Sequence, residues 1–169
     1  MPKRTLHKLI PELIPSDLWG RSAYKMLGAK PAWRKKIRPD AVKRADGKCE
    51  ICGVKAKRLI CHDKWSYNDN TATASLVGFE VHCGDCDLVT HFKRAMMVMD
   101  KEEVLRSVLF QLCKVNACQE VDAAKIITDA DALWSKRNRK KWSLRIAPAL
   151  VKIYPELKEL PNFNPVPTN

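Results

Sequence analysis

The chain of 169 residues carries a formal net charge of +12 at pH 7 and has an isoelectric point near 9.5. A charge of this size predicts a polyanionic partner, of which nucleic acid is the simplest. Apolar residues make up 46% of the chain, as in ordinary soluble globular proteins. No run approaches the ~18 apolar residues that a membrane-spanning helix needs, so we expect no membrane partner.

The first residues are basic, but prolines interrupt their short apolar stretch and no small-residue cleavage site follows. We therefore expect no signal peptide. The seven cysteines are an odd number, which favours reduced thiols and metal binding over disulfides. Together these features predict a cytoplasmic protein.

The charge is unevenly distributed along the chain. Residues 1–48 carry 13 Lys and Arg against 4 Asp and Glu, residues 49–100 carry 6 against 7, and residues 101–169 carry 12 against 8. A nearly neutral, cysteine-rich middle therefore lies between two basic segments. We predict four parts: a basic N-terminal helical arm over 1–48, a zinc module over 49–100, a helical pair over 101–145 and an extended tail over 146–169.

Two short helices are expected in the N-terminal arm. A start signal at Ser16 and a stop at Gly28 predict a helix over residues 17–27. Pro31 occupies a first-turn position, and Pro39 should break or kink the helix that follows it. The residues expected to face inward from that helix are Trp33, Ile37 and Val42.

The middle of the chain predicts two strands, a loop and a helix. The strands are "KRLICH" (57–62) and "FEVHC" (79–83), the second because apolar and polar residues alternate. The polar residues 63–78 between them predict a loop, and residues 84–99 follow a helical apolar period. We expect His82, on the second strand, to be an exposed residue and not a ligand.

Two longer helices are predicted over residues 101–116 and 119–139, where apolar positions keep a 3.6-residue period. Cys113 and Cys118 are expected to be packed thiols in this region. The proline-rich end of the chain predicts the extended tail.

Two Cys-x-x-Cys pairs, Cys49 with Cys52 and Cys83 with Cys86, form the most specific motif. A pair at this spacing presents two thiolates to one ion, and two pairs complete a tetrahedral sulfur shell that suits zinc. The alternative is four unrelated buried cysteines, since free cysteine is often buried. We predict a structural zinc site, because a closed four-sulfur shell leaves no position open for a substrate.

The knuckle, the hairpin and the helix that begins at the second pair resemble a treble clef, the frame of the HNH (ββα-metal) endonucleases. The segments "AVKRADGKCEICG", "LICHDKWSYND" and "VHCGDCDLVTH", within residues 33–95, carry this resemblance. It implies an α+β fold in which a small ββα zinc module is flanked by the N-terminal helical arm and the C-terminal helical pair. It also implies metal-dependent hydrolysis of phosphodiester bonds in DNA.

By position, the resemblance assigns His62 as the general base and Asp87 and His91 as ligands of a catalytic metal ion, with Cys61 at the place of a further ligand. Asp87 and His91 are four residues apart, so they share a helix face and one divalent ion could bridge them. The implied chemistry is single-metal hydrolysis, in which neutral His62 takes a proton from the attacking water.

The sequence departs from the family pattern at two positions. Asp87 replaces a His or Asn, and a carboxylate suits Mg²⁺ or Mn²⁺. Cys61 replaces an Asp or His; it is not a ligand, or the ion is a softer one, or the site is inactive. Either Asn68 or Asn70 could supply the middle asparagine of the motif. Alternatively, Asp87 stabilises the first turn of its helix and His91 is a core histidine.

The segments "WRKKIR" (33–38) and "WSKRNRKKWSLR" (134–145) are strongly basic and predict contacts with phosphates. A solvated helix end is the alternative, since Lys and Arg offset the helix dipole there. Six basic residues among the twelve of the second segment exceed that need. The predicted nucleic-acid contacts are Arg34, Lys35, Lys36, Arg38, Lys136, Arg137, Arg139, Lys140 and Lys141.

These patterns favour an HNH-like endonuclease that acts on double-stranded DNA, with structural zinc and catalytic Mg²⁺ or Mn²⁺. One alternative is a non-catalytic, zinc-stabilised nucleic-acid-binding protein. Another is a regulator that binds a protein partner through the C-terminal helices. A second metal ion bound near His62, Asp87 and His91 would favour the enzyme.

Overall fold

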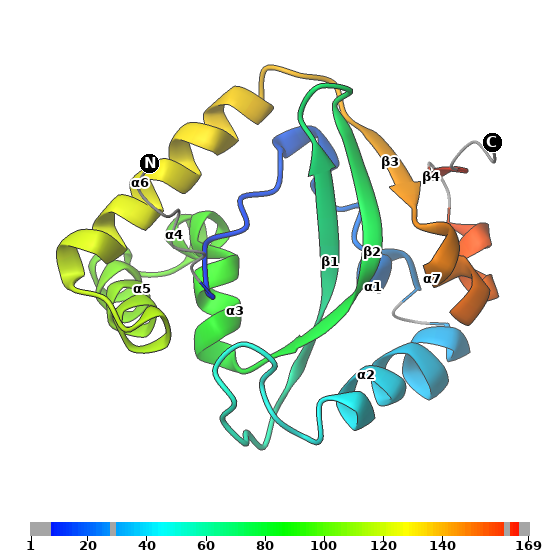
Figure 1. Ribbon diagram of the computed structural model, residues 1–169, viewed down its shortest axis with the longest axis horizontal. Helices are drawn as coiled ribbons and strands as arrows, with labels where there is room; N and C mark the ends of the chain where they lie inside the picture. The colour runs from blue at the N-terminus through cyan, green and yellow to red at the C-terminus, as the bar shows by residue number, and fades with distance from the viewer. Residues whose placement is uncertain (1–7, 28–29, 161–162, 166–169) are drawn as a thin grey trace, which may run out of the picture.

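The computed structural model describes residues 8–27, 30–160 and the backbone of 163–165, and it has the mixed α+β fold that the sequence predicted. A long hairpin of β1 and β2 runs through the middle of the molecule (Figure 1). Helices α3 to α6 lie on one side of the hairpin, and α1, α2 and α7 lie on the other. Within the described ranges, no helix is both long and apolar enough to cross a membrane.

Within the described residues, the sheet has four strands in the order β1-β2-β3-β4, which makes β1 an edge strand. β1 and β2 are antiparallel, whereas β3 is parallel to β2 and β4 is parallel to β3. The register sets His62 directly opposite Glu80, so their side chains share one face of the hairpin. The strands are β1 (Ile60–Asn68), β2 (Thr73–His82), β3 (Ser143–Ile146) and β4 (Phe163–Pro165).

The prediction of a loop over residues 63–78 is wrong. Most of these residues continue the two strands, and only residues 69–72 form the turn. Ala74, Leu76 and Phe79 are buried, while Ser75 and Val77 between them are more exposed. A half-exposed hairpin and a polar loop are hard to distinguish when the alternation is short.

The helix predicted over residues 17–27 is interrupted. A 3-10 turn, η1 (Ser16–Leu18), precedes the short helix α1 (Ala23–Leu27), and Gly20 between them has a φ of +81°. Glycine adopts this left-handed backbone without the steric cost that a side chain would add. The chain therefore turns at Gly20 instead of continuing as one helix.

Pro39 lies within a continuous helical stretch. The π-type helix η2 (Trp33–Ile37) leads into α2 (Arg38–Arg44), and Pro39 occupies the first turn of α2. The wider π turn accommodates a proline, whose nitrogen cannot donate a hydrogen bond. Both end residues of η2 are buried, as predicted.

The helix predicted over residues 84–99 is divided into α3 (Gly84–Thr90) and α4 (Phe92–Val98), which meet at His91. The two long helices agree with the prediction. They are α5 (Lys101–Asn116) and α6 (Glu120–Arg137), and α5 packs against both α3 and α4.

The extended tail predicted over residues 146–169 is partly helical. α7 (Pro148–Ile153) and the 3-10 helix η3 (Pro155–Glu159) follow β3. Their apolar side chains join the main core, and the buried leucines are Leu150, Leu157 and Leu160. The other residues of this prediction at 161–162 and 166–169 lie outside the described part.

The N-terminal strap (Leu9–Leu18), an extended segment that ends in the 3-10 turn η1, runs between the hairpin and the helices on one side of it (Figure 1). Asn116 bonds both the N–H and the carbonyl of Leu9, at 2.9 and 2.8 Å. Asn138 accepts a hydrogen bond from the Ser16 N–H at 2.8 Å. Side chains of α5 and the end of α6 thus hold the strap although it belongs to no strand.

Arg137, the last residue of α6, holds the tip of the hairpin. Its guanidinium makes two hydrogen bonds to Asp69 in the turn, at 2.9 and 3.0 Å, and lies 4.2 Å from the centre of the Tyr67 ring. The Arg137 side chain is only 14% exposed. A residue predicted to contact phosphate therefore already has structural partners.

Arg137→Ala should destabilise the protein by about 1–3 kcal/mol, because Asp69 loses its bidentate partner and Tyr67 loses its packed cation. The midpoint of thermal unfolding should fall by about 2–4 °C for each kcal/mol. Arg139→Ala is the control, since Arg139 is exposed, and it should change the midpoint little. Equal unfolding midpoints for the two variants would contradict a stabilising role of the Arg137 contacts.

Candidate functional site

Four cysteine side chains gather where the loop before β1 meets the junction of β2 and α3. The sulfurs of Cys49, Cys52, Cys83 and Cys86 all lie within 4.8 Å of one another, and Cys52 Sγ is 3.6 Å from Cys83 Sγ. Four sulfurs bound tetrahedrally at about 2.3 Å from zinc would be about 3.8 Å apart. The cluster can therefore hold a metal ion such as zinc with little rearrangement.

Local hydrogen bonds shape the first pair into a knuckle. The Cys49 N–H donates to the Val54 carbonyl at 2.9 Å, and the Gly53 N–H donates to the Cys49 carbonyl at 2.8 Å. Gly53 has a φ of +76°, which a side chain would strain. The second pair spans the end of β2 and the first turn of α3, so Cys83 and Cys86 point to the same place.

Glu50 ties this knuckle to β2. Its backbone N–H donates to the Val81 carbonyl at 2.8 Å, and its carboxylate accepts a hydrogen bond from the Val81 N–H at 2.7 Å. Arg44 donates to Glu50 at 3.2 Å and to the Phe79 carbonyl at 2.6 Å. These contacts hold the first cysteine pair against the strand that leads to the second.

Hydrogen bonds favour the thiolate of Cys49, whereas burial raises the pKa of Cys83 and of Cys86. Burial raises the pKa of Cys49, but hydrogen bonds from neighbouring backbone N–H groups outweigh burial and lower this pKa to about 7. Gln111 of α5, which is 3% exposed, donates to Cys86 Sγ at 3.2 Å. Sequence reasoning missed Gln111, although a polar residue on the apolar stripe of a helix was an available signal.

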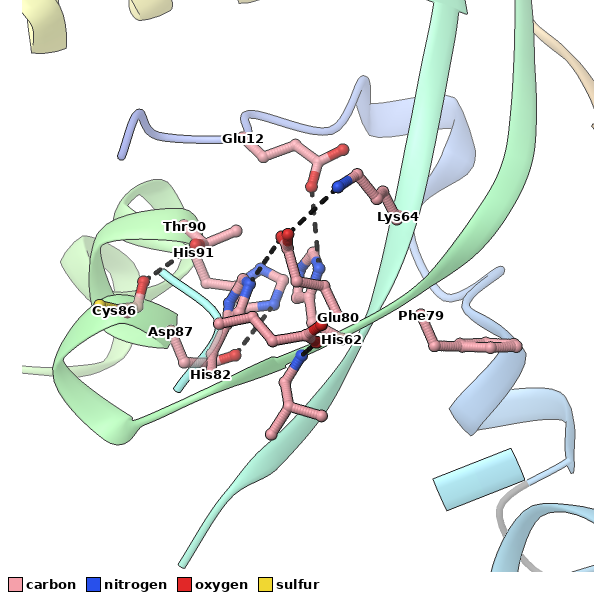
Figure 2. Close-up of polar contacts among 12 residues, drawn as sticks. Glu12, His62, Lys64, Phe79, Glu80, His82, Cys86, Asp87, Thr90 and His91 are labelled. Carbon is pink, nitrogen blue, oxygen red and sulfur yellow. Dashed lines mark hydrogen bonds and ion pairs between the residues drawn. The ribbon is translucent and has the colours of Figure 1, made fainter. Parts of the chain in front are cut away.

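A second group of polar side chains, the histidine cluster, lies between the hairpin and α3 (Figure 2). It consists of His62 from β1, His82 from β2, and Asp87 and His91 at α3. The centre of the His62 ring is 4.9 Å from that of His82 and 4.8 Å from that of His91. The structure thus brings together His62, Asp87 and His91, as expected from the family resemblance, and adds His82.

Glu80 orients two neighbours of this cluster. Its carboxylate lies 3.1 Å from His82 Nε2 and 3.1 Å from Lys64 Nζ. The hydrogen bond with His82 lowers the pKa of Glu80 to about 2 against the opposing effect of burial. Glu80 is therefore a carboxylate, which can accept a hydrogen bond from His82 Nε2.

Burial keeps His62 neutral. Its side chain is 7% exposed, and burial, followed by the charges of His91 and His82, lowers the pKa of His62 to about 3. His82 is 3% exposed, so the expectation of an exposed strand residue is wrong. The reason is that α3 folds back over this end of the hairpin and removes the face from solvent.

Cys61 lies on the other face of β1 from His62, because side chains alternate along a strand. It is opposite Val81 and packs against the main core. Burial raises the pKa of Cys61 to about 12, so it is a neutral thiol. The structure does not bring Cys61 into the histidine cluster.

Two atoms of the histidine cluster, His82 Nδ1 and Asp87 Oδ1, are buried without a hydrogen-bond partner. Such atoms are costly unless a metal ion or water satisfies them. Asp87 Oδ1 is 3.8 Å from His91 Nε2, within the about 4.2 Å that two metal bonds of about 2.1 Å can span. The donor types therefore fit a divalent ion. Among the described residues, however, only the four cysteines bring three or more ligand atoms within 4.8 Å of one another.

Neither Asn68 nor Asn70 supplies the asparagine expected from the family resemblance. Both lie at the tip of the hairpin, where Asn68 Oδ1 accepts hydrogen bonds from the N–H groups of Asn70 and Thr71 at 3.0 and 3.1 Å. Asn68 is six positions after His62 in β1, about 20 Å along an extended strand. The two asparagines are therefore remote from the histidine cluster.

Glu12 is a further residue that sequence reasoning missed. The strap sets its carboxylate over the histidine cluster, with Oε2 3.9 Å from His62 Nδ1, which is too long for a direct hydrogen bond (Figure 2). The Glu12 N–H donates to the Thr90 carbonyl at 3.0 Å. Burial and then the charge of Asp63 raise the pKa of Glu12 to about 8. No local motif marks Glu12, since the contact is purely tertiary.

The two basic segments lie at opposite ends of the hairpin, η2 and α2 near its open end and the end of α6 near its tip (Figure 1). Lys36 pairs with Glu156 at 3.2 Å, and Arg38 donates to the Leu59 carbonyl at 3.4 Å. The structure does not bring the segments together. Their exposed members, besides Arg38, are Arg34, Lys35, Lys136, Arg139, Lys140 and Lys141.

Metal analysis of the purified protein should find about one tightly bound zinc ion per chain. Cys49→Ser and Cys83→Ser should each lose the ion and unfold the module, because binding of a structural metal is coupled to folding. Cys118→Ser removes a thiol outside the cluster and should keep both the metal and the fold. Well-folded protein without metal would contradict this prediction, which circular dichroism and elemental analysis test together.

Glu12→Gln should change how stability depends on pH. The folded protein, with the pKa of Glu12 raised from 4.5 to about 8, keeps a proton that the unfolded chain releases at lower pH. This contribution to stability is complete below the unfolded pKa and is lost as the pH rises through about 8. The amide cannot ionise. The midpoint of thermal unfolding of the variant should therefore rise relative to that of the wild type, by roughly 5 °C or more between about pH 5 and pH 9. A difference independent of pH would contradict this.

The chain matches no known protein-family model, no curated protein and no solved structure. The chemistry of the two clusters is therefore the basis for assigning a function.

Proposed function

We propose that this chain is a zinc-stabilised, metal-dependent endonuclease of the HNH kind, which hydrolyses phosphodiester bonds in nucleic acid. The observation that carries the proposal is the β1–β2–α3 unit. This unit follows the cysteine knuckle in the chain. His62, His82, Asp87 and His91 lie together between its strands and its helix. The net charge of +12 suits a polyanionic substrate.

In this proposal the four cysteines hold a structural zinc ion. Four sulfurs complete the tetrahedral shell and leave no position for a substrate. Cys83 follows His82 directly and Cys86 precedes Asp87 directly, so the same ion fixes the backbone on which two members of the histidine cluster depend.

Asp87 and His91 would hold the catalytic ion, with His82 in place of Cys61 as the third ligand. His82 Nδ1 is buried and has no other partner, whereas Cys61 points to the opposite face of β1. One carboxylate with two imidazoles favours Mn²⁺ over Mg²⁺, which prefers oxygen ligands. When bound, such an ion would polarise the scissile phosphate and stabilise the leaving oxygen.

His62 would accept the proton of the attacking water. Burial keeps its ring neutral, as a proton acceptor must be. A phosphate anion in the site would raise the pKa of His62 toward the working pH, because a nearby negative charge stabilises imidazolium. A positioned general base of this kind accelerates a reaction by about 10²–10⁴-fold.

A non-catalytic nucleic-acid-binding protein with the same zinc module is the second candidate. Two observations favour it: the ligand atoms of the histidine cluster do not converge within the described residues, and the strap sets Glu12 over His62. The positive charge of the chain would serve this function equally. A cleavage assay separates the two candidates.

The wild-type protein should nick supercoiled plasmid in the presence of Mn²⁺, and less rapidly with Mg²⁺. His62→Ala should lower the rate by about 10²–10⁴-fold through loss of the base. Its unfolding midpoint and its DNA affinity should remain near those of the wild type. Failure to cleave with any of several divalent ions, or cleavage that survives His62→Ala, would favour the non-catalytic candidate.

Variants of the ligands test the assignment of the metal site. Asp87→Ala, His91→Ala and His82→Ala should each lose activity that excess Mn²⁺ partly restores, since they act through the metal. Cys61→Ala is the matched control and should retain activity. Activity lost in Cys61→Ala but retained in His82→Ala would overturn the choice of third ligand.

A further inference from the structure

Two clefts reach His62 and border different parts of the strap. The first, of about 860 Å³, also contains Asp87 and His91. The second, of about 1140 Å³, also contains Glu80 and His82. Glu12 lines both, so the strap passes where the clefts approach each other.

Charge distinguishes the two clefts. The first is lined by the basic residues Arg21, Lys25, Arg38, Arg58, Lys93 and Arg94 and by the acids Glu12, Asp63 and Asp87. The second is lined by Lys8, Lys64, Lys125 and Arg137 and by the acids Glu12, Asp63, Glu80, Asp122 and Asp129. Basic residues outnumber acids only in the first, which we name the basic cleft. A chain of phosphates would be attracted to this side of His62.

Four cations of the basic cleft are open to a ligand. Arg21, Lys25, Arg58 and Arg94 are exposed, and none of them forms an ion pair with a described residue. By contrast, Lys93 pairs with Asp131, and Arg38 donates a hydrogen bond to the Leu59 carbonyl. We name these four residues the cationic rim. Unpaired cations around a cleft are the usual means of contacting a phosphate backbone.

Exposed aromatic rings line the same cleft. Trp19 is 49% exposed and Tyr24 is 61% exposed, whereas the exposed ring of Phe110 on α5 lines neither cleft. Both rings are held in place. The Trp19 indole N–H donates to the Ile14 carbonyl at 2.8 Å, and the Tyr24 ring packs 5.6 Å from that of buried Trp33. Held aromatic rings that face solvent are suited to stacking.

The two rings and two rim cations belong to one short segment, "WGRSAYK" (19–25), in which aromatic and basic residues are interleaved. This segment is anchored beside the candidate base. Asp63, the neighbour of His62 in β1 whose side chain lies on the opposite face of this edge strand, accepts a hydrogen bond from the Ala23 N–H at 2.7 Å. The segment is therefore positioned relative to the histidine cluster by a buried contact.

We propose that the basic cleft binds single-stranded nucleic acid, with unpaired bases stacked on Trp19 and Tyr24 and phosphates held by the cationic rim. A base can stack on a side chain only when it is not enclosed in a duplex, and such stacking tolerates any sequence. This inference rests on the proposed function and narrows its substrate from nucleic acid in general to unpaired strands. It also moves the phosphate contacts away from the two basic segments.

Binding is measured by fluorescence anisotropy with a labelled oligonucleotide, as a single strand and as its duplex. The His62→Ala protein without added divalent ion keeps the substrate intact. We expect the single strand to bind at least about tenfold more tightly than the duplex, since stacking contributes only to the former. Affinity should fall steeply with salt.

Two sets of variants separate stacking from charge. Trp19→Ala combined with Tyr24→Ala should weaken single-strand binding at least about tenfold without changing the salt slope. Phe110→Ala is the matched control and should bind normally. Changing the four rim cations to Gln should flatten the salt slope by up to about 0.7 for each phosphate that is no longer neutralised. The control variant removes the same amount of charge outside the basic cleft and should flatten the salt slope less. Its four replacements by Gln are at Lys35, Lys136, Arg139 and Lys141.

Tighter binding to the duplex, or equal slopes for the rim and distant charge variants, would overturn the inference. Each variant is first checked for its unfolding midpoint, and single replacements of Arg58 and Arg94 provide the charge test if the fourfold variant does not fold. The outcome is distinguishable from that of the nuclease assay. Stacked single-strand binding without cleavage would refute only the proposed nuclease activity. Cleavage without a preference for single strands would refute only the proposed binding mode of the basic cleft.

Discussion

The four-cysteine cluster joins two parts of the chain that the rest of the structure needs in contact. One pair lies in the knuckle before β1, and the other lies at the junction of β2 and α3. Cys49, Cys83 and Cys86 are buried in the main core, so the cluster is continuous with the apolar packing around it. Glu50 ties the knuckle to β2, and Gln111 supports the cluster from α5. A bound metal ion, through its tetrahedral coordination, would fix the direction in which α3 leaves the hairpin.

The histidine cluster depends on that direction and on the register of the hairpin. A slip of one residue in β1 would turn His62 toward the core and Cys61 toward α3, because the side-chain period of a strand is two. Burial then determines the protonation state of His62. Three neighbouring imidazoles repel one another when protonated, which together with burial keeps His62 neutral. The same burial leaves His82 Nδ1 and Asp87 Oδ1 without partners, which is the condition in which a divalent ion would be favoured.

The N-terminal strap completes the surroundings of this cluster from the far end of the chain. Its backbone is held by Asn116 and Asn138, at the ends of the two long helices, and its Glu12 lies over His62. Where the strap ends, the segment with Trp19 and Tyr24 forms the wall of the basic cleft. The part of the chain that closes over the candidate base is thus continuous with the part proposed to stack on the substrate. Any displacement of the strap would alter both.

Local sequence determined the elements whose signals are contained in short stretches of chain. The Cys-x-x-Cys pairs predicted the cysteine cluster, and the 3.6-residue periods predicted α5 and α6, because ligand spacing and helical periodicity are local properties. The α+β class, which the structure has, was implied by the family resemblance of the cysteine-rich segments. Tertiary structure decided what depends on distant neighbours. It extended the hairpin through a polar stretch, folded the proline-rich tail, buried His82, turned Cys61 away, and brought Glu12 to His62. It also gave Arg137 and Lys36 acidic partners and left other cations around the basic cleft. Burial and pairing are set by residues far apart in the chain, and for that reason no local pattern contained them.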